Sequence, residues 1–331
     1  RSLAGTLDSL MYANYSALFP TLFKTDELRA KTSAIRQICQ LVAMVISIVL
    51  TPVVTSKIGY GVTAVIYGAI ALVVILYTAF GCYENIEEER EESENSEKPD
   101  LFKAIFALIT NGKFWIYGLA FALYSAAFSL IAQAVPFYVE YTLKLGSSMT
   151  TVMLAVVFGF ALIGIIIWSN VVKNIGIMNV FRLGFIIMTV GFIPLFFAKK
   201  MFFAAAIMSV MGIGVAGILV TLDCISAKII DDDYERHGVK REGMLTSLIG
   251  VMGRLSGIYV SLGYKVIGSA FGFESGLNPG TNPDMASRFL LCVFPFIALA
   301  VSTVFTLFLH FKDEDKDWFV LKKKKEKNAN V

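Results

Sequence analysis

The chain has 331 residues, of which 56% are hydrophobic and 17% are charged, and its mean hydropathy is +0.68. A soluble domain of this size is not that apolar. The net charge is only +3, from 29 basic and 26 acidic residues, and gives no indication of nucleic-acid binding. The composition therefore predicts an integral membrane protein.

Nearly the whole sequence divides into apolar blocks long enough to cross a hydrocarbon core, which takes roughly 20 helical residues. The blocks are apolar on every face, so they predict helices rather than alternating strands. Nine spans are predicted, at 3–22, 35–55, 62–82, 114–138, 150–172, 179–198, 202–224, 244–268 and 289–311. The predicted fold class is an all-α polytopic membrane protein.

Lysine and arginine indicate the orientation, because cytoplasmic loops carry the excess of these residues. With the carboxy terminus inside, 20 of the 29 basic residues fall on the cytoplasmic side and 7 on the other, while Arg36 and Arg254 lie inside spans. We expect a multi-pass protein of the plasma membrane with a cytoplasmic C-terminus.

A run with eight glutamates, from Glu84 to Asp100, separates three spans from six. Its charge and few apolar residues predict a solvated linker, and six spans are the half-unit of several two-bundle transporters. If the halves match, three spans are missing at the front. The predicted domains are 1–82, three helices of an N-terminal bundle; 83–113, an acidic cytoplasmic linker; 114–311, a C-terminal six-helix bundle; and 312–331, a basic cytoplasmic tail.

Three polar side chains share one face of the first predicted span. Asp8, Tyr12 and Tyr15 follow one another at helical spacing, so a helix projects them from the same side. A carboxylate flanked by phenols suits a hydroxylated ligand, because it accepts hydrogen bonds from hydroxyls while an aromatic face covers the apolar side of a ring. The alternative is that Asp8 lies near the outer membrane surface and is only solvated.

Two arginines lie inside predicted spans, where an ionisable side chain is costly and is therefore a functional candidate. Arg36 opens the second span, and Arg254 lies deep in the eighth among Gly250, Gly253 and Gly257. A guanidinium at that depth stays charged and needs a carboxylate, carbonyls or a water-filled cavity. The glycines permit close approach of a helix or a ligand. The alternative is a packing motif whose arginine satisfies a helix end.

The other candidates are weaker. Asp223, near the end of the seventh span, is a candidate partner of Lys228 or of Arg254, with a plain helix-end charge as the alternative. The glycines of 212–217 predict a close helix contact. The four cysteines are scattered singly, so neither a metal site nor a disulfide framework is indicated. No paired nucleophile or acid dyad is present in the spans, and the sequence predicts neither an enzyme nor a bound cofactor.

Two segments carry a resemblance to a known family. The first is the run 14–20, Asn-Tyr-Ser-Ala-Leu-Phe-Pro, followed by the charged loop 25–29 and by Arg36. The second is the acidic-then-basic run 230–243, which ends in Arg-Glu-Gly. They resemble, in order, the fourth span to the fifth-span arginine and the loop between the tenth and eleventh spans of the glycoside–pentoside–hexuronide:cation symporters. That is the melibiose-permease-like branch of the major facilitator superfamily.

The resemblance implies major-facilitator-type helical bundles, with nine helices present of a presumed twelve. It also implies secondary active transport of a sugar or glycoside, coupled to a sodium ion or proton whose site cannot be located in this chain, because the family's cation site also draws carboxylates from the second span. Arg254 falls where the family places an eleventh-span lysine facing the cavity. Galactoside-binding members use a fourth-span aspartate, which corresponds here to Tyr12, with Asp8 one turn further out. Related branches carry lysolipids.

We therefore expect alternating access around a solute site, with a latch at the cytoplasmic side whose charges pair in one state and separate in the other. The substrate-binding candidates are Arg254, Asp8, Tyr12 and Tyr15. The gating candidates are Arg36, Asp231, Asp233, Lys240 and Arg241. The alternatives are that these loop charges only mark the cytoplasmic side, that the protein carries a lysolipid or other amphiphile, or that it is a non-transporting scaffold or receptor. Its expected partners are a small-molecule solute and the lipid bilayer, and we expect a monomer.

Overall fold

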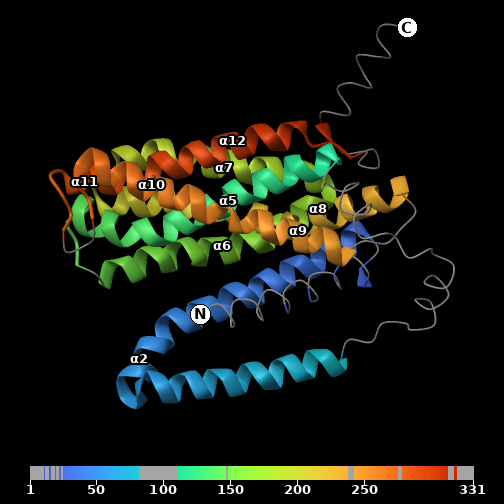
Figure 1. The fold of residues 1–331 in the computed structure, drawn as a ribbon, viewed down its shortest axis with the longest axis horizontal. Helices are drawn as coiled ribbons and strands as arrows, with labels where there is room; N and C mark the ends of the chain where they lie inside the picture. Colours follow the sequence, from blue (N-terminus) through green and yellow to red (C-terminus); the bar gives the residue numbers. More distant parts are fainter. Residues whose placement is uncertain are drawn as a thin grey trace, which may run out of the picture.

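The structure is a computed structural model, and it describes residues 11, 15, 19, 22, 23, 25–81, 110–146, 148–237, 242–274, 278–311 and 317–318. These residues are almost entirely helical. The prediction of an all-α membrane fold is confirmed. Figure 1 shows a compact bundle of helices with one long, bent helix running beside it.

The long helix, α2 (Asp26–Gly81), consists of two arms joined at a kink. Gly59 forms the kink with φ 77° and ψ 163°, a conformation that a residue with a Cβ rarely adopts. Eight residues from Gly59 in each direction, the hydroxyls of Thr51 and Tyr67 lie 3.1 Å apart and join the two arms. The second and third predicted spans are therefore the arms of one helical hairpin.

The remaining helices pack side by side in the bundle (Figure 1). Two of them contain short π-helical turns, labelled η. In chain order they are α5 (Gly112–Phe137), η1 (Tyr138–Thr142), α6 (Ser148–Ile175), α7 (Ile177–Phe197), α8 (Met201–His237), α9 (Glu242–Arg254), α10 (Ser256–Phe271), α11 (Pro283–Arg288), η2 (Phe289–Val293) and α12 (Phe294–Phe308).

The described residues do not support the predicted number of nine spanning helices. Seven helices in them are long and apolar enough to cross a membrane, at Lys57–Gly81, Gly112–Thr142, Met149–Ile175, Ile177–Phe197, Met201–Arg236, Gly243–Phe271 and Pro283–Phe308. Of the two other predicted spans, 3–22 falls largely outside the described residues. The span at 35–55 is helical, but it continues a first arm that begins in the charged stretch at Asp26 and is not among the seven.

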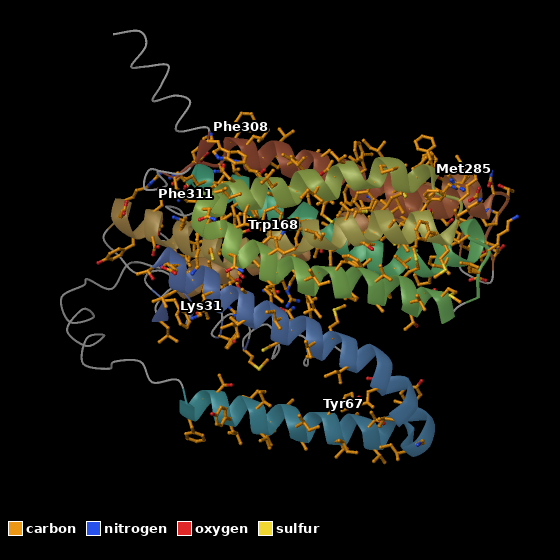
Figure 2. The ribbon with its side chains drawn as sticks, turned by 180° about the vertical axis from the view of Figure 1, so that it is seen from behind. Lys31, Tyr67, Trp168, Met285, Phe308 and Phe311 are labelled. Atoms are coloured by element: carbon orange, nitrogen blue, oxygen red, sulfur yellow. The ribbon has the colours of Figure 1, made fainter. Side chains whose placement is uncertain are left out.

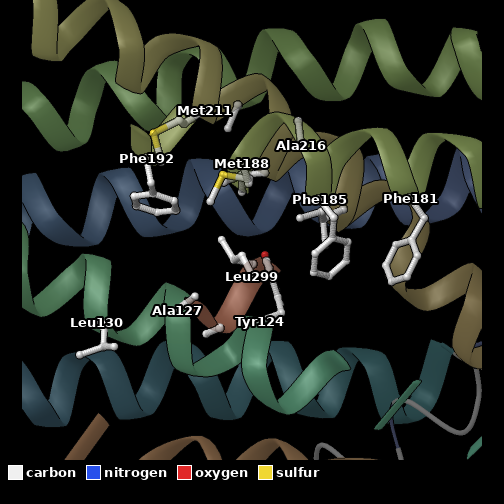
Figure 3. Close-up of a cluster of buried hydrophobic side chains, with 14 of the residues drawn as sticks. Tyr124, Ala127, Leu130, Phe181, Phe185, Met188, Phe192, Met211, Ala216 and Leu299 are labelled. Atoms are coloured by element: carbon white, nitrogen blue, oxygen red, sulfur yellow. The ribbon is translucent and has the colours of Figure 1, made fainter. Parts of the chain in front are cut away.

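Aromatic and methionine side chains build the core of the bundle (Figure 3). Phe185 of α7 has its ring centroid 5.9 Å from that of Tyr124 and 4.9 Å from that of Phe181, both edge-on. Edge-to-face pairs of this kind are favoured by the ring quadrupoles. Met188 and Phe192 continue the same row along α7 and are fully buried. The row packs one face of α7 into the core, while Val190 and Ile193 on its other face are exposed.

Glycines let α8 approach α6 and α7 closely, as the sequence predicted for 212–217. A Cβ atom at Gly212 would lie 2.5 Å from the carbonyl oxygen of Val157, and one at Gly184 would lie 2.9 Å from that of Gly214. Close backbone packing matters in lipid, where helices gain no hydrophobic advantage by leaving the solvent and rely on dispersion contacts. The predicted close helix contact is confirmed.

The first arm of α2 touches the bundle only near its beginning. Figure 2 shows Lys31 of this arm at the same end of the molecule as Phe308 and Phe311, while Tyr67 on the second arm lies apart from the bundle. Among the described side chains from Val42 to Gly81, only that of Thr63 is buried. We call the end of the bundle where α2 begins and α8 ends the charged end.

Candidate functional site

The charged end holds a buried ion pair between two segments far apart in the sequence. Arg29 of α2 places Nη1 2.5 Å from Oδ2 of Asp231 and Nη2 3.3 Å from Oδ1, so the contact is bidentate. Its Nε donates to the carbonyl of Phe23 at 2.6 Å. The Arg29 side chain is 4% exposed, against 49% for Asp231. The guanidinium is thus held from two sides, while the carboxylate keeps contact with solvent.

A second ion pair lies further along the same two helices. Arg36 Nη1 is 3.2 Å from Oδ2 of Asp223, and the Ser33 hydroxyl donates to the same oxygen at 3.2 Å. Both charged side chains are 23% exposed. The pair therefore lies at a boundary between protein and solvent or lipid, where the net gain from an ion pair is modest.

Aromatic rings cover the other side of Arg36. Its guanidinium carbon lies 5.0 Å from the centroid of Tyr15 and 5.1 Å from that of Phe19. A cation over an aromatic face at this distance is attracted by the ring quadrupole. Arg36 therefore links the first predicted span to α8 through a ring on one side and a carboxylate on the other.

The two ion pairs are in register because α2 and α8 run antiparallel here. The arginines are seven residues apart and the aspartates eight, which corresponds to about 10.5 Å and about 12 Å along a helix axis. Small buried side chains lie between the arginines, namely Ala30, Ser33 and Ala34. These allow the helices to approach closely enough for both pairs to form.

Three consecutive aspartates at the end of α8 are placed in three different environments. Asp231 binds Arg29 of α2, whereas Asp232 binds Lys113 at the start of α5 and is 2.9 Å from Arg236 of its own helix. Asp233 is 1% exposed and lies within the protein. Successive side chains on a helix point about 100° apart. The three aspartates of this one turn therefore face α2, α5 and the protein interior.

An exposed ion pair joins α2 to α6 at the same end. Lys173 Nζ lies 2.8 Å from Oε1 of Glu27, with side-chain exposures of 51% and 70%. The hydrogen bond from Lys173 lowers the pKa of Glu27. A pair this exposed contributes little to stability, but it adds a third charged contact between α2 and the bundle.

The predicted span that contains Arg254 is interrupted at one residue, Leu255, which keeps a right-handed helical backbone with φ −63° and ψ −17°. Helix α9 ends at Arg254, and α10 begins at Ser256. On either side of the break, Leu255 N–H donates to the carbonyl of Met252 and Ile258 N–H donates to that of Leu255, each at 3.0 Å. These are i to i+3 bonds, the pattern of a tightened 3₁₀ turn. Arg254 stands at this break and is exposed.

Two exposed stripes run side by side along α9 and α10. One is apolar and consists of Val251, Leu255, Ile258, Leu262 and Val266. The other consists of small or polar residues, namely Arg254, Gly257, Ser261 and Lys265. Both keep a spacing of three or four residues, so each follows one line of the helix surface. The two stripes call for different surroundings, since the first suits lipid and the second suits water or a polar ligand.

The structure brings together only part of the predicted site. Tyr15, predicted to bind solute, lies against Arg36, predicted to take part in gating. The prediction that Asp223 pairs with Lys228 or Arg254 is wrong, because its carboxylate binds Arg36, which reaches it from α2. Arg254 lies at the helix break.

Four predicted site residues, Asp8, Tyr12, Lys240 and Arg241, lie outside the described residues, as does the predicted linker from 83 to 109, while its last residues, 112 and 113, belong to α5. The roles assigned to all of these residues, and the division of the chain into domains, stay predictions.

Several partners in this network were not singled out from the sequence. The sequence distinguishes Arg29 and Lys113 only as basic residues on the predicted cytoplasmic side, and Asp232 only as a member of the acidic run in 230–243. A signal was nevertheless present, because Arg29 and Asp231 lie in the two segments that carry the family resemblance. Two polar segments that share a resemblance are candidates for mutual contact.

Comparison with known proteins agrees with this fold. A family model described as MFS/sugar transport protein matches residues 3–313. Among solved structures, the chain is similar to the Major Facilitator Superfamily transporter FucP, determined by crystallography in the outward conformation. The two share 13% sequence identity and a TM-score of 0.64, over 91% of this chain and 73% of that one. At this identity the likeness shows the fold alone. No curated protein matches the sequence.

Proposed function

The chain belongs to the MFS/sugar transport protein family, and from this premise we propose that it carries a sugar or glycoside across the plasma membrane by cation-coupled symport. Membership and fold indicate a multi-pass membrane transporter of a small molecule rather than an enzyme. The finer assignment, to the melibiose-permease-like branch with sodium ion or proton as the coupling ion, rests on the two segments at 14–36 and 230–243.

The observation that carries the proposal is the restricted contact between α2 and the bundle. Ion pairs hold α2 to α8 and α6 at the charged end, and the described remainder of α2 is almost entirely exposed. Alternating access needs two bodies that touch at one end at a time. A contact made of a few ion pairs, small side chains and one buried leucine, Leu41, can separate without breaking a large core, so it supports a gate.

The excess of basic residues predicts that the charged end is cytoplasmic. The ion pairs of Arg29 with Asp231 and of Arg36 with Asp223 then close the cytoplasmic side. The similar transporter FucP was determined in the outward conformation, which is the state that a closed cytoplasmic gate accompanies. We assign this chain to the same state.

We place the solute near the break between α9 and α10. A short change of helix type inside a helix often marks a functional position. Arg254 adds a guanidinium whose rigid fork can bind two oxygens of one ligand. In this proposal the stripe that contains Arg254 and Ser261 faces the space between the two bodies, and the apolar stripe beside it faces lipid.

A binding screen in lipid nanodiscs tests the proposal. The probes are monosaccharides, disaccharides, glycosides and lysolipids, each with and without sodium and at two pH values, and the readout is the shift in Tm. We expect a sugar or glycoside to raise Tm and the coupling ion to increase that shift. Counterflow of the stabilising solute in proteoliposomes then distinguishes a carrier from a receptor.

Two variants test the place of the solute. Arg254→Met removes the charge and keeps most of the volume, so it should lose the solute-dependent shift while its Tm without solute stays close to that of the unmodified protein. Lys200→Met, which removes an exposed charge between α7 and α8, is the control and should keep the shift. Stabilisation by lysolipids alone would favour the amphiphile carrier, and an unchanged response in Arg254→Met would remove Arg254 from the site.

A further inference from the structure

A buried arginine on α7 is oriented by the end of a neighbouring helix. Arg182 is 3% exposed. Its Nε donates to the carbonyl of Thr306 at 3.2 Å, and its Nη2 donates to that of Leu309 at 2.8 Å. Both carbonyls lie where α12 ends, and the last carbonyls of a helix have no partner further along it. The backbone of α12 therefore fixes the plane in which the guanidinium lies.

The same guanidinium also binds a carboxylate from the C-terminal segment. Arg182 Nη1 lies 2.6 Å from Oδ1 of Asp317, and Nη2 lies 3.1 Å from Oδ2. Asp317 is 0% exposed. The ring nitrogen Nδ1 of His310 is 3.1 Å from Nη2 and 3.2 Å from Oδ2, so it borders both groups. This is a bidentate, charge-assisted contact in a water-excluded place, the strongest form of ion-pair hydrogen bonding.

The next residue attaches to α7 at a second point. The backbone N–H of Trp318 donates to Oδ1 of Asn179 at 3.4 Å. Asn179 is itself buried, and its Nδ2 donates to the carbonyl of Ile175 at 2.7 Å, which fixes its side chain. The end of α12 thus orients Arg182, and the end of α6 orients Asn179. Neither side chain depends on the C-terminal segment for its orientation.

We propose that α7 and the end of α12 form a carboxylate-binding site, and that this chain occupies it with its own Asp317. The protein surroundings orient the site before the ligand arrives, because Arg182 is held by α12. The ligand reaches it on a segment that begins only a few residues after α12, and a short tether gives a high effective concentration. Residues 317–318 are then a clasp that joins α7 to α12 at the charged end.

A carboxylate-specific site predicts rescue by a small carboxylate, which nonspecific packing of the C-terminal segment does not predict. Removal of Asp317 leaves a buried guanidinium without its carboxylate, which is strongly destabilising. A small free carboxylate of the same geometry, such as formate, should then enter the vacated site. Chloride should serve poorly, since a single sphere cannot accept both parallel N–H bonds of the fork.

The experiment compares Asp317→Ala with Asp315→Ala in nanodiscs. The control removes an equal charge two positions earlier in the same acidic stretch. We expect Asp317→Ala to lower Tm by roughly 5 °C, from the loss of one member of a buried pair, and to lower it more than Asp315→Ala does. Sodium formate should restore part of the loss, whereas sodium chloride at the same ionic strength should not.

A second readout follows the segment itself. With 5-fluorotryptophan in the protein, the ¹⁹F signal of Trp318 is identified by its absence from Trp318→Phe. Asp317→Ala should narrow and shift this signal alone. Formate should not restore the original ¹⁹F signal, because formate fills the site without tethering the segment that carries Trp318. Asp317→Asn, which keeps the side-chain shape, replaces Asp317→Ala if the latter does not fold.

Three results would overturn the proposal. They are an unchanged Tm in both Asp317 variants, equal effects of the Asp315 and Asp317 variants on the Trp318 signal, and equal restoration by formate and chloride. Any of them would show that the segment is not held by a carboxylate-specific site.

Discussion

Arg36 on α2 and Asp223 on α8, which are 187 positions apart in the sequence, meet at 3.2 Å. The Ser33 hydroxyl, one turn earlier on α2, reaches the same carboxylate oxygen. The contact therefore holds together two helices that are far apart in the covalent chain. Its strength can be measured separately from the folding of the bundle.

A double-mutant cycle with Arg36→Gln and Asp223→Asn should show a coupling of about 1 kcal/mol, because both side chains are partly exposed. The measurement is hydrogen exchange at the backbone amides of 29–37, where we expect each single variant to lower protection several-fold. The matched control is the exposed pair, with Glu27→Gln and Lys173→Gln, whose coupling should be smaller. A coupling no larger than that of the control would mean that Arg36 and Asp223 are only neighbours.

Arg29 should be harder to replace than Arg36, because its side chain is buried and donates to both Asp231 and the Phe23 carbonyl. Arg29→Lys keeps the charge but cannot reproduce the bidentate fork together with the third bond. We therefore expect Arg29→Lys to lower amide protection at 29–37 nearly as much as Arg29→Gln does. Full protection in the lysine variant would show that charge alone holds the contact.

The close fit of α9 on α5 should be visible in a pair of glycine variants. A Cβ atom at Gly253 would lie 2.7 Å from the ring of Phe121, whereas one at Gly250 would meet nothing within 4 Å. Gly253→Ala forces the ring to move and should lower stability by about 1–3 kcal/mol. Gly250→Ala should be neutral or should raise stability by about 0.5–1 kcal/mol, through the higher helix propensity of alanine. Thermal unfolding of both variants in nanodiscs compares them directly, and a Gly253→Ala variant as stable as Gly250→Ala would contradict the contact.

The kink in α2 should depend on Gly59. Its φ of 77° is costly for alanine, by roughly 1–3 kcal/mol for a backbone held in such a region. We expect Gly59→Ala to widen the distribution of distances between spin labels on the two arms, measured by electron paramagnetic resonance. Gly61→Ala, two residues later and with open space around it, should leave the distribution unchanged. Equal effects of the two variants would argue against a kink set by backbone conformation.

The pair of Glu27 and Lys173 should give the contact between α2 and α6 a pH dependence. The hydrogen bond from Lys173 lowers the pKa of Glu27 in the folded state. A carboxyl group of this kind stabilises the contact above its unfolded pKa, about 4.3 for glutamate. That stabilisation is lost as the pH falls through the lower folded value. Fluorescence energy transfer between α2 and α6 should fall in acid, and the difference between the unmodified protein and Glu27→Gln isolates this group from other carboxylates. An acid response that Glu27→Gln leaves unchanged would contradict it.

The architecture could be predicted from the sequence because spans in lipid are set by length and apolarity, and both are local properties. Most of the helices follow the predicted blocks, but α8 continues to His237, well past the predicted end at 224, and the first arm of α2 begins at Asp26, before the predicted start at 35. The break at Leu255 could not be predicted in this way, since neither Arg254 nor Ser256 beside it is a helix breaker, and Gly250, Gly253 and Gly257 permit a continuous helix as well as a broken one. The break depends on what α9 and α10 pack against.

The candidate site was predictable only in its parts. The cost of a charge in a span identifies Arg36 and Arg254 as unusual, but it does not say which carboxylate each one meets. Asp223 pairs with Arg36 because α2 and α8 run antiparallel at the charged end, which is a property of the tertiary arrangement. Tyr15 shows the same limit, since helical spacing grouped it with Asp8 and Tyr12 and the fold placed it over Arg36.

The three carboxylates at the end of α8 limit which insertions and deletions this helix can accept. Each added residue turns the helix beyond it by about 100°, so a single insertion between Asp223 and Asp231 would present the wrong carboxylate to Arg29 and to Lys113 at once. An insertion of seven residues, close to two full turns, restores the directions but moves the end of the helix outward by about 10.5 Å. The stretch from Asp223 to Asp233 should therefore vary by substitution and not by insertion or deletion.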